Sequence, residues 1–136
     1  MRNSIFFLVF LMSVFSLFPF FVTADEQEET DKQIITAITA GNAENLSKYF
    51  NSMVDCGIMG NEDTYSKAQA TRIIQDFFDK YPVKSLKITK QGTSTDGSRF
   101  SIGELVAGGK MFRLFYLLKK ISGSYVIQLF QIQEEH

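Results

Sequence analysis

The sequence predicts an α+β domain in which three helices precede a curved antiparallel sheet of four main strands. Apolar residues before Pro82 recur at helical spacing, whereas those after Pro82 alternate with a period of two. The stretch 110–133 is rich in β-branched and aromatic residues and is partly apolar on both faces. A strand of that kind must be covered twice, so helices are expected on one face and a second cover on the other.

Residues 1–24 form a separate N-terminal segment. Arg2 precedes an uncharged run from Ser4 to Ala24, which ends in Val-Thr-Ala before the acidic DEQEE. This pattern is typical of a secretory signal peptide cleaved after Ala24. The alternative is an uncleaved membrane anchor, because the apolar run approaches the length that spans a bilayer. We expect an exported protein, periplasmic or at the cell surface of a bacterium.

The charge balance and the cysteine content limit the classes of partner and the cellular compartment that are expected. Without Arg2, the 14 cationic residues become 13 against 15 acids, a formal charge of −2. This balance predicts no nucleic-acid partner, and membrane contact only through the first segment if it is retained. Cys56 is the only cysteine, so no internal disulfide can form. An exported domain without disulfides fits a bacterium better than an animal secretory pathway.

The helical half follows an acidic leader, 25–29, and opens the predicted domain, 30–133. Thr30 and Gln33 have capping-box spacing and predict a helix over 30–40. Asn42 is a suitable cap for a second short helix over 43–50, and residues 53–65 are interpreted as a short strand and a loop. Ser66 and Gln69 form another capping box. They open the clearest apolar stripe in the chain: Ala70, Ile73, Ile74, Phe77, Phe78 and Tyr81.

The strand half is divided by glycine turns. Strands are expected at 84–92, 98–106, 110–120 and 124–133, joined by two-residue turns at Asp96-Gly97, Gly108-Gly109 and Ser122-Gly123. These turns fix the register, because they place Thr95 opposite Ser98, Ala107 opposite Lys110, and Ile121 opposite Ser124. A slip of one residue in any turn would exchange the two faces.

In that register the two faces of the sheet differ. The drier face, expected to receive the helices, carries Leu86, Ile88, Ser101, Gly103, Leu105, Phe112, Leu114, Tyr116, Leu118, Ile127 and Leu129. The other face carries Lys87, Thr89, Gln91, Phe100, Ile102, Glu104, Arg113, Phe115, Leu117, Gln128 and Phe130. Its large apolar side chains predict a homodimer interface made by Phe100, Ile102, Arg113, Phe115 and Phe130. The alternative is a terminal segment that covers this face.

Four segments carry a resemblance to a known family: GNAENLSKYFNSMVD, YSKAQATRIIQDFF, GSRFSIGEL and FRLFYLLKK. They resemble an exported bacterial family known as domain of unknown function 4783, over about 30–132. The order of elements is similar to that of the nuclear transport factor 2-like (cystatin-like) superfamily. The resemblance implies a cone in which a bent sheet wraps a long helix, and frequent dimers. It implies no activity.

The sequence offers little for catalysis. His136, the only histidine, is the last residue, so Cys56 and the serines lack an ordered imidazole partner. We therefore assign no catalytic residue, metal site or cofactor. Glu62-Asp63 is interpreted as a solvated acidic pair. The alternative is an isomerase or cyclase in which Asp55 or Glu104 acts as a general base in the cone beside Tyr116, Tyr49 or Tyr65.

A non-enzymatic binding module is the favoured interpretation. The cone could enclose a mostly apolar ligand cavity lined by Tyr49, Tyr65, Phe77, Arg99, Phe112 and Tyr116. The competing interpretation is that these aromatic side chains simply fill the core. The expected partners are a second copy of the chain and a small apolar ligand or another protein.

Overall fold

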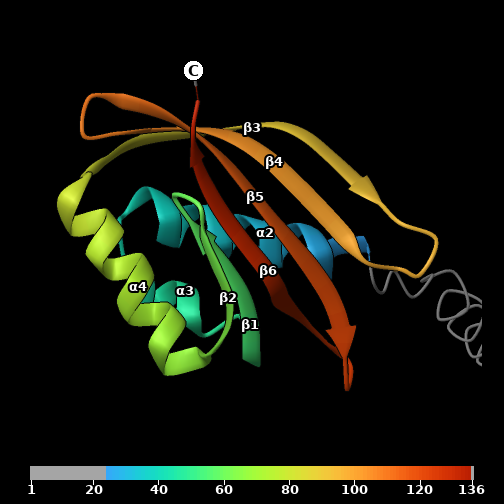
Figure 1. Ribbon diagram of the computed structural model, residues 1–136. Coiled ribbons are helices and arrows are strands. Elements are labelled where there is room, and N and C mark those ends of the chain that lie inside the picture. Colours follow the sequence, from blue (N-terminus) through green and yellow to red (C-terminus); the bar gives the residue numbers. More distant parts are fainter. Residues whose placement is uncertain (1–23, 136) are drawn as a thin grey trace, which may run out of the picture.

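The computed structural model describes residues 24–135 (Figure 1). The predicted signal peptide lies outside the described residues, apart from Ala24. No helix within 24–135 has the length and apolar character needed to cross a membrane. The helices are α2 (Ala24–Thr39), α3 (Ala43–Ser47) and α4 (Lys67–Lys80). The strands are β1 (Phe50–Ile58), β2 (Asn61–Ser66), β3 (Val83–Thr93), β4 (Arg99–Ala107), β5 (Lys110–Ile121) and β6 (Ser124–Glu134).

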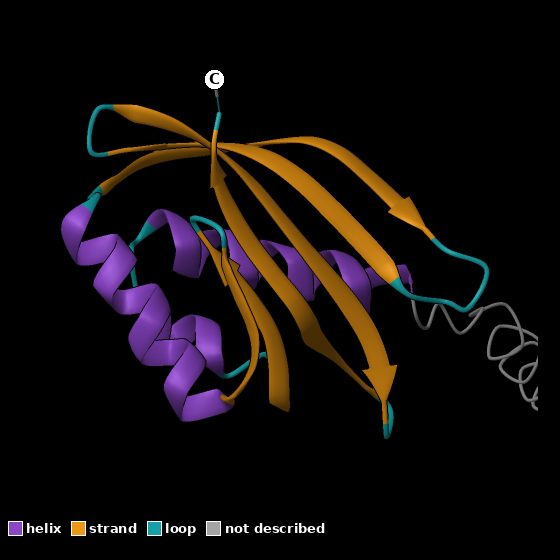
Figure 2. Ribbon diagram, viewed as in Figure 1, coloured by secondary structure: helices purple, strands orange, loops and turns teal. Residues whose placement is uncertain are grey.

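All strands belong to one sheet in the order β2-β1-β6-β5-β4-β3. Among the described strands, only β1 and β6 pair in parallel. The sheet arches over α2, and the helices lie on its inner face (Figures 1 and 2). The prediction of four main strands was wrong, because residues 50–66 form a hairpin rather than a short strand and a loop. Met59 and Gly60 make its turn, both with positive φ.

Of the three predicted helix caps, one was wrong and two were correct. Thr30 is not a cap, because its hydroxyl donates to the Glu26 carbonyl inside α2 at 2.8 Å. The acidic leader is therefore the beginning of α2. The other two caps are confirmed. The Asn42 side chain accepts from the Asn45 N–H at 3.0 Å, and Ser66 forms a reciprocal capping box with Gln69.

The register between β4 and β5 is confirmed along its whole length, with Ala107 opposite Lys110 and Glu104 opposite Arg113. Between β5 and β6 the predicted register holds from the turn to Ile127 and then changes, because Gln128 is an extra residue in β6. This bulge reverses the faces beyond it. Phe130 consequently faces inward and is fully buried, whereas Leu129 faces outward; both were predicted on the opposite face.

The register between β3 and β4 was also predicted wrongly. The connection is wider than a two-residue turn, because the Ser94 N–H donates to the Ser98 carbonyl at 2.8 Å. A second irregularity follows Ile88. Gln91 therefore shares the inner face with Ser101, and its amide donates to the Ser101 hydroxyl at 3.1 Å.

The interior of the cone is filled with side chains. Phe77 of α4 and Tyr81, the residue that caps the C-terminal end of α4, contact Phe112 of β5, with ring centroids 5.0 and 5.1 Å from it. Phe112, Leu114 and Tyr116 have no exposed surface. The structure thus shows a packed core where the sequence left a core and a ligand cavity as alternatives.

Candidate ligand-binding groove

A polar cluster lies inside the cone, centred on Asp31 of α2, which is only 4% exposed. One carboxylate oxygen accepts from the Arg99 Nε at 2.8 Å, and the other accepts from the Tyr116 hydroxyl at 2.7 Å. Gln91 continues the network, because its side-chain oxygen accepts from the Arg99 guanidinium at 3.3 Å. The cluster ties α2 to β3, β4 and β5 through satisfied hydrogen bonds.

This arrangement bears on the enzyme alternative. Asp55 and Glu104 both lie on the outer face of the sheet, opposite Leu129 and Arg113, so neither can act beside the buried Tyr116. That part of the prediction was wrong, and the acid that reaches Tyr116 is Asp31. Burial raises the pKa of the Tyr116 hydroxyl, and its hydrogen bond to Asp31 raises it further. The phenol is therefore a neutral donor in the physiological range.

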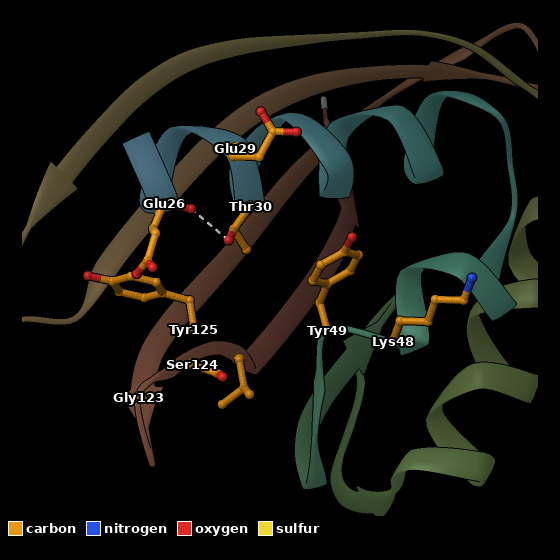
Figure 3. Close-up of a pocket in the computed structure, with 9 residues that line it drawn as sticks. Glu26, Glu29, Thr30, Lys48, Tyr49, Gly123, Ser124 and Tyr125 are labelled. Carbon is orange, nitrogen blue, oxygen red and sulfur yellow. Dashed lines mark hydrogen bonds between the residues drawn. The ribbon is translucent and has the colours of Figure 1, made fainter. Parts of the chain in front are cut away.

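A groove opens beside α2, where the helix faces the starts of β1 and β6 (Figure 3). It has a volume of about 430 Å³ and is lined by Glu26, Glu29, Thr30, Lys48, Tyr49, Gly123, Ser124, Tyr125 and Val126. In Figure 3 the Glu26 carboxylate reaches toward the Tyr125 ring, whereas Glu29 points away from it. The groove therefore presents two aromatic rings and a carboxylate to solvent.

Both tyrosines of this groove are fixed by α2. The Tyr49 hydroxyl donates to the Gln33 side-chain oxygen, and the Tyr125 hydroxyl accepts from the Gln27 amide at 2.5 Å. The Lys120 ammonium lies 5.4 Å from the centre of the Tyr125 ring. The two rings are thus held in place before any ligand arrives, which lowers the entropic cost of binding.

A second groove continues the first along the same helix. It has a volume of about 380 Å³ and shares Glu29, Lys48 and Tyr49 with the first; Lys32, Gln33, Thr36, Ala37, Ala40 and Asn45 complete its lining. Together the two make an elongated groove, here called the α2 groove, with Tyr49 near its middle. Its walls carry both acidic and basic side chains.

The predicted ligand-binding residues do not line a common cavity. Phe77, Phe112 and Tyr116 pack in the core, and Arg99 is held by Asp31. Tyr65 lies in β2 and lines a separate depression beside Arg72 of α4. Tyr49 alone lines the α2 groove. Within the described part of the chain, no three His, Cys, Asp or Glu side chains lie close enough together to hold a metal ion.

The outer face of the sheet carries a partly buried apolar patch, here called the outer patch: Phe100, Ile102, Phe115, Leu117 and Leu129. The Phe100 and Phe115 rings stack with centroids 6.3 Å apart. Phe130, predicted in this interface, is absent from it because the bulge at Gln128 turns its ring into the core. Leu129 takes the outward position instead.

Cys56 is the one buried thiol of the described chain, and burial raises its pKa to about 11. We expect a thiol reagent at pH 8 to modify native Cys56 at least ~100-fold more slowly than the urea-unfolded chain, whose thiol has a pKa of about 8.5. Above about pH 8.5 the unfolded chain loses the Cys56 proton whereas the folded chain keeps it. The free energy of unfolding should therefore fall as the pH rises toward 11. Equal modification rates in the two states would contradict the buried position in β1.

Three helices on the inner face of a curved, mostly antiparallel sheet define the nuclear transport factor 2-like, or cystatin-like, class of α+β domains. A domain of unknown function with a cystatin-like fold from Nostoc punctiforme shares this fold. Its TM-score is 0.66 at 12% identity, over 85% of this chain and 80% of that one. At that identity the likeness concerns the fold alone.

The sequence also assigns the chain to a specific family within this class of fold. The family model "Domain of unknown function (DUF4783)" matches residues 31–133, and the chain belongs to this family. A DUF4783 family protein from Bacteroides uniformis is 30% identical, with a TM-score of 0.72 over 77% of this chain and 96% of that one. A second, from Bacteroides ovatus, is 32% identical, with a TM-score of 0.72 over 76% and 94%. The curated proteins contain no match to this chain.

Proposed function

We propose that the protein is an exported, non-catalytic binding module whose α2 groove holds an extended peptide segment of a partner protein. The elongated shape of the groove is the observation that carries this proposal. Two adjoining hollows of about 430 and 380 Å³ share the Tyr49 ring and run along one helix. An extended chain fits such a shape better than a compact ligand does.

The chemistry of the groove supports the same ligand class. Tyrosine offers a large contact surface at low entropic cost, and its ring suits both apolar and polar side chains of a peptide. Glu26 lines the first hollow and Lys32 the second, whereas Glu29 and Lys48 line both. Charges of both signs favour a peptide of mixed charge over an apolar molecule.

The isomerase or cyclase alternative rests on the hydrogen bond between Tyr116 and Asp31. It is less well supported, because the Asp31 carboxylate is only 4% exposed and its oxygens accept from Arg99 and Tyr116. A substrate would have to displace Arg99 or Tyr116. Neither of the two hollows of the α2 groove is lined by Asp31.

Selection of a displayed peptide library on the immobilised protein tests the groove. The full chain is expressed from its first codon and recovered from the periplasm, where its intact mass shows whether it begins at Asp25. We expect enriched peptides whose affinity falls ~10-fold or more in Tyr49→Ala and in Tyr125→Ala, because truncating a central aromatic contact has that size of effect.

Tyr65→Ala is the matched control, since Tyr65 is also partly buried but lies away from α2. It should leave peptide affinity unchanged. A library that yields no enriched peptide would refute the peptide proposal, and so would peptides that bind both groove variants at full affinity.

A further inference from the structure

The sheet is incomplete at the corner beside the α2 groove. Strand β6 begins at Ser124, and its first three residues pair with β5 on one side. On the other side of β6, the ladder with β1 begins only at Ile127, which is paired with Phe50. Within the described residues, no strand therefore lies beside Ser124–Val126 on that side. These three residues also line the first hollow of the α2 groove, so its wall includes a free strand edge.

Helix α3 keeps β1 from filling this corner. If the parallel register were continued, Lys48 would lie opposite Tyr125. Lys48 instead has the helical backbone angles φ −60° and ψ −23°, and its N–H donates to the Asn45 carbonyl at 3.3 Å. The Tyr49 N–H likewise donates to the Leu46 carbonyl at 3.1 Å. The chain thus enters β1 from a helical turn and leaves the position opposite Tyr125 open.

The backbone groups of Tyr125 point into this open corner. Along a strand, the N–H and C=O groups of successive residues alternate between its two sides. The Ile127 N–H points away from β5, because it donates to the Tyr49 carbonyl at 2.6 Å. Residues 124–127 pair with β5 without a bulge, so the N–H and C=O of Tyr125, two residues earlier, point the same way. The first hollow is therefore bordered by one backbone donor and one backbone acceptor that have no partner strand among the described residues.

We infer that the α2 groove recognises its peptide through the peptide backbone, which adds a short strand to β6 at Tyr125. This inference rests on the proposed function and specifies the ligand class: an extended segment with a free N–H at the paired position, which excludes proline there. In an antiparallel pair, the peptide residue opposite Tyr125 exchanges both hydrogen bonds with it. Ser124–Val126 span about 10 Å, so about three peptide residues occupy the corner. The rest of the peptide can continue past Tyr49 into the second hollow.

The pairing also places the side chain of the paired peptide residue. Residues opposite each other in a ladder project to the same face, and the Tyr125 hydroxyl is hydrogen-bonded to α2. The peptide side chain therefore points at α2, where the Glu26 carboxylate lies beside the Tyr125 ring (Figure 3). Glu26, Glu29 and Lys48 line this hollow, and the Lys120 ammonium lies over the Tyr125 ring, 5.4 Å from its centre. A lysine or arginine at the paired position complements the excess of acid in the lining.

Backbone N-methylation of the peptide tests the pairing. The tightest peptide from the library selection is synthesised with each amide methylated in turn, and calorimetry measures its affinity for the protein recovered from the periplasm. We expect methylation at one position to lower the affinity ~10-fold or more, because it removes the donor to the Tyr125 carbonyl. Methylation of either neighbouring residue should leave the affinity nearly unchanged, since those N–H groups point away from β6.

Amide hydrogen exchange, followed by NMR on the isotopically labelled protein, tests the same contact from the other side. At saturation with this peptide, the Tyr125 amide should exchange ~10-fold or more slowly, because it gains a hydrogen bond. The Ile127 amide is the control, since it already donates to the Tyr49 carbonyl and should change less.

Charge reversal at Glu26 tests the placement of the paired side chain. Glu26→Lys should weaken the form of the peptide with lysine at the paired position ~5-fold and should strengthen the form with glutamate there. An unchanged preference would overturn this placement.

The outcomes separate the strand pairing from the groove itself. Peptides that lose affinity in Tyr49→Ala but tolerate every N-methylation would overturn the pairing and leave the groove proposal standing. The same holds if they leave the exchange of the Tyr125 amide unchanged. A library that yields no enriched peptide would refute both.

Discussion

Replacing Asp31 by alanine is expected to lower the free energy of unfolding by about 3–5 kcal/mol. The substitution leaves the Arg99 guanidinium without its carboxylate and removes the acceptor of the buried Tyr116 hydroxyl. Since domains of this size are stable by about 5–15 kcal/mol, the variant should retain a fraction of its stability or fail to fold. Urea denaturation followed by circular dichroism measures the change.

Two further variants separate the ion pair from other effects. Glu29→Ala removes an exposed acid from the same helix and should change stability by no more than about 0.5 kcal/mol. Asp31→Ala combined with Arg99→Met should be more stable than Asp31→Ala alone, because no uncompensated charge then remains near the core. A cost below about 1 kcal/mol for Asp31→Ala would show that the cluster does not hold α2 on the sheet.

The second large effect is expected at Phe130. Phe130→Ala should cost about 3–5 kcal/mol, because the ring is fully buried and its loss leaves a cavity. Its ring centroid lies 6.3 Å from that of Phe50, so the substitution also breaks an aromatic pair between β1 and β6. The same urea denaturation experiment measures it.

Phe115→Ala is the matched comparison, because Phe115 is the aromatic residue that does face outward near this position. At protein concentrations where the chain is monomeric, it should cost less than about 1.5 kcal/mol, since its ring is only partly buried. Equal costs at the two positions would mean that the bulge at Gln128 is absent in solution.

The strand pairings of the sheet could be predicted from the sequence only in part. The Gly108-Gly109 turn fixed the pairing of β4 with β5 completely, because both glycines adopt positive φ in a tight connection. The bulge at Gln128 could not be predicted, since an extra residue in a strand leaves no local signature when both faces are partly apolar. Its consequence was an exchange of faces for Leu129 and Phe130.

The hairpin of β1 and β2 was missed for a different reason. NEDTYS has few of the residues that favour strands, and its pairing with β1 is fixed by the Met59-Gly60 turn and by the parallel pairing of β1 with β6. Parallel pairing joins residues more than seventy positions apart, which no local pattern reports. Tertiary contacts therefore override weak strand propensity here.

The candidate site was predicted less well than the fold. Asp31 carried a signal that was not used: it precedes Ile34 and Ile38 at helical spacing, so an acid occupies the apolar stripe of its helix. A charged residue at a core position predicts a buried partner. The role of Tyr125 could not be found in the same way, because it depends on Gln27, which lies 98 positions away.

The position of β6 in the sheet has a consequence for how the chain reaches its native state. β6 is the last strand in the sequence, yet it separates β1 and β2 from β5, β4 and β3. The two groups of strands cannot join into one sheet until residues 124–134 are available, because β6 lies between them. Folding therefore depends on a late contact of long sequence separation, which slows it relative to domains with local pairing. A chain still emerging from a ribosome would hold two incomplete half-sheets, and the eleven residues of β6 would convert them into one cooperative unit.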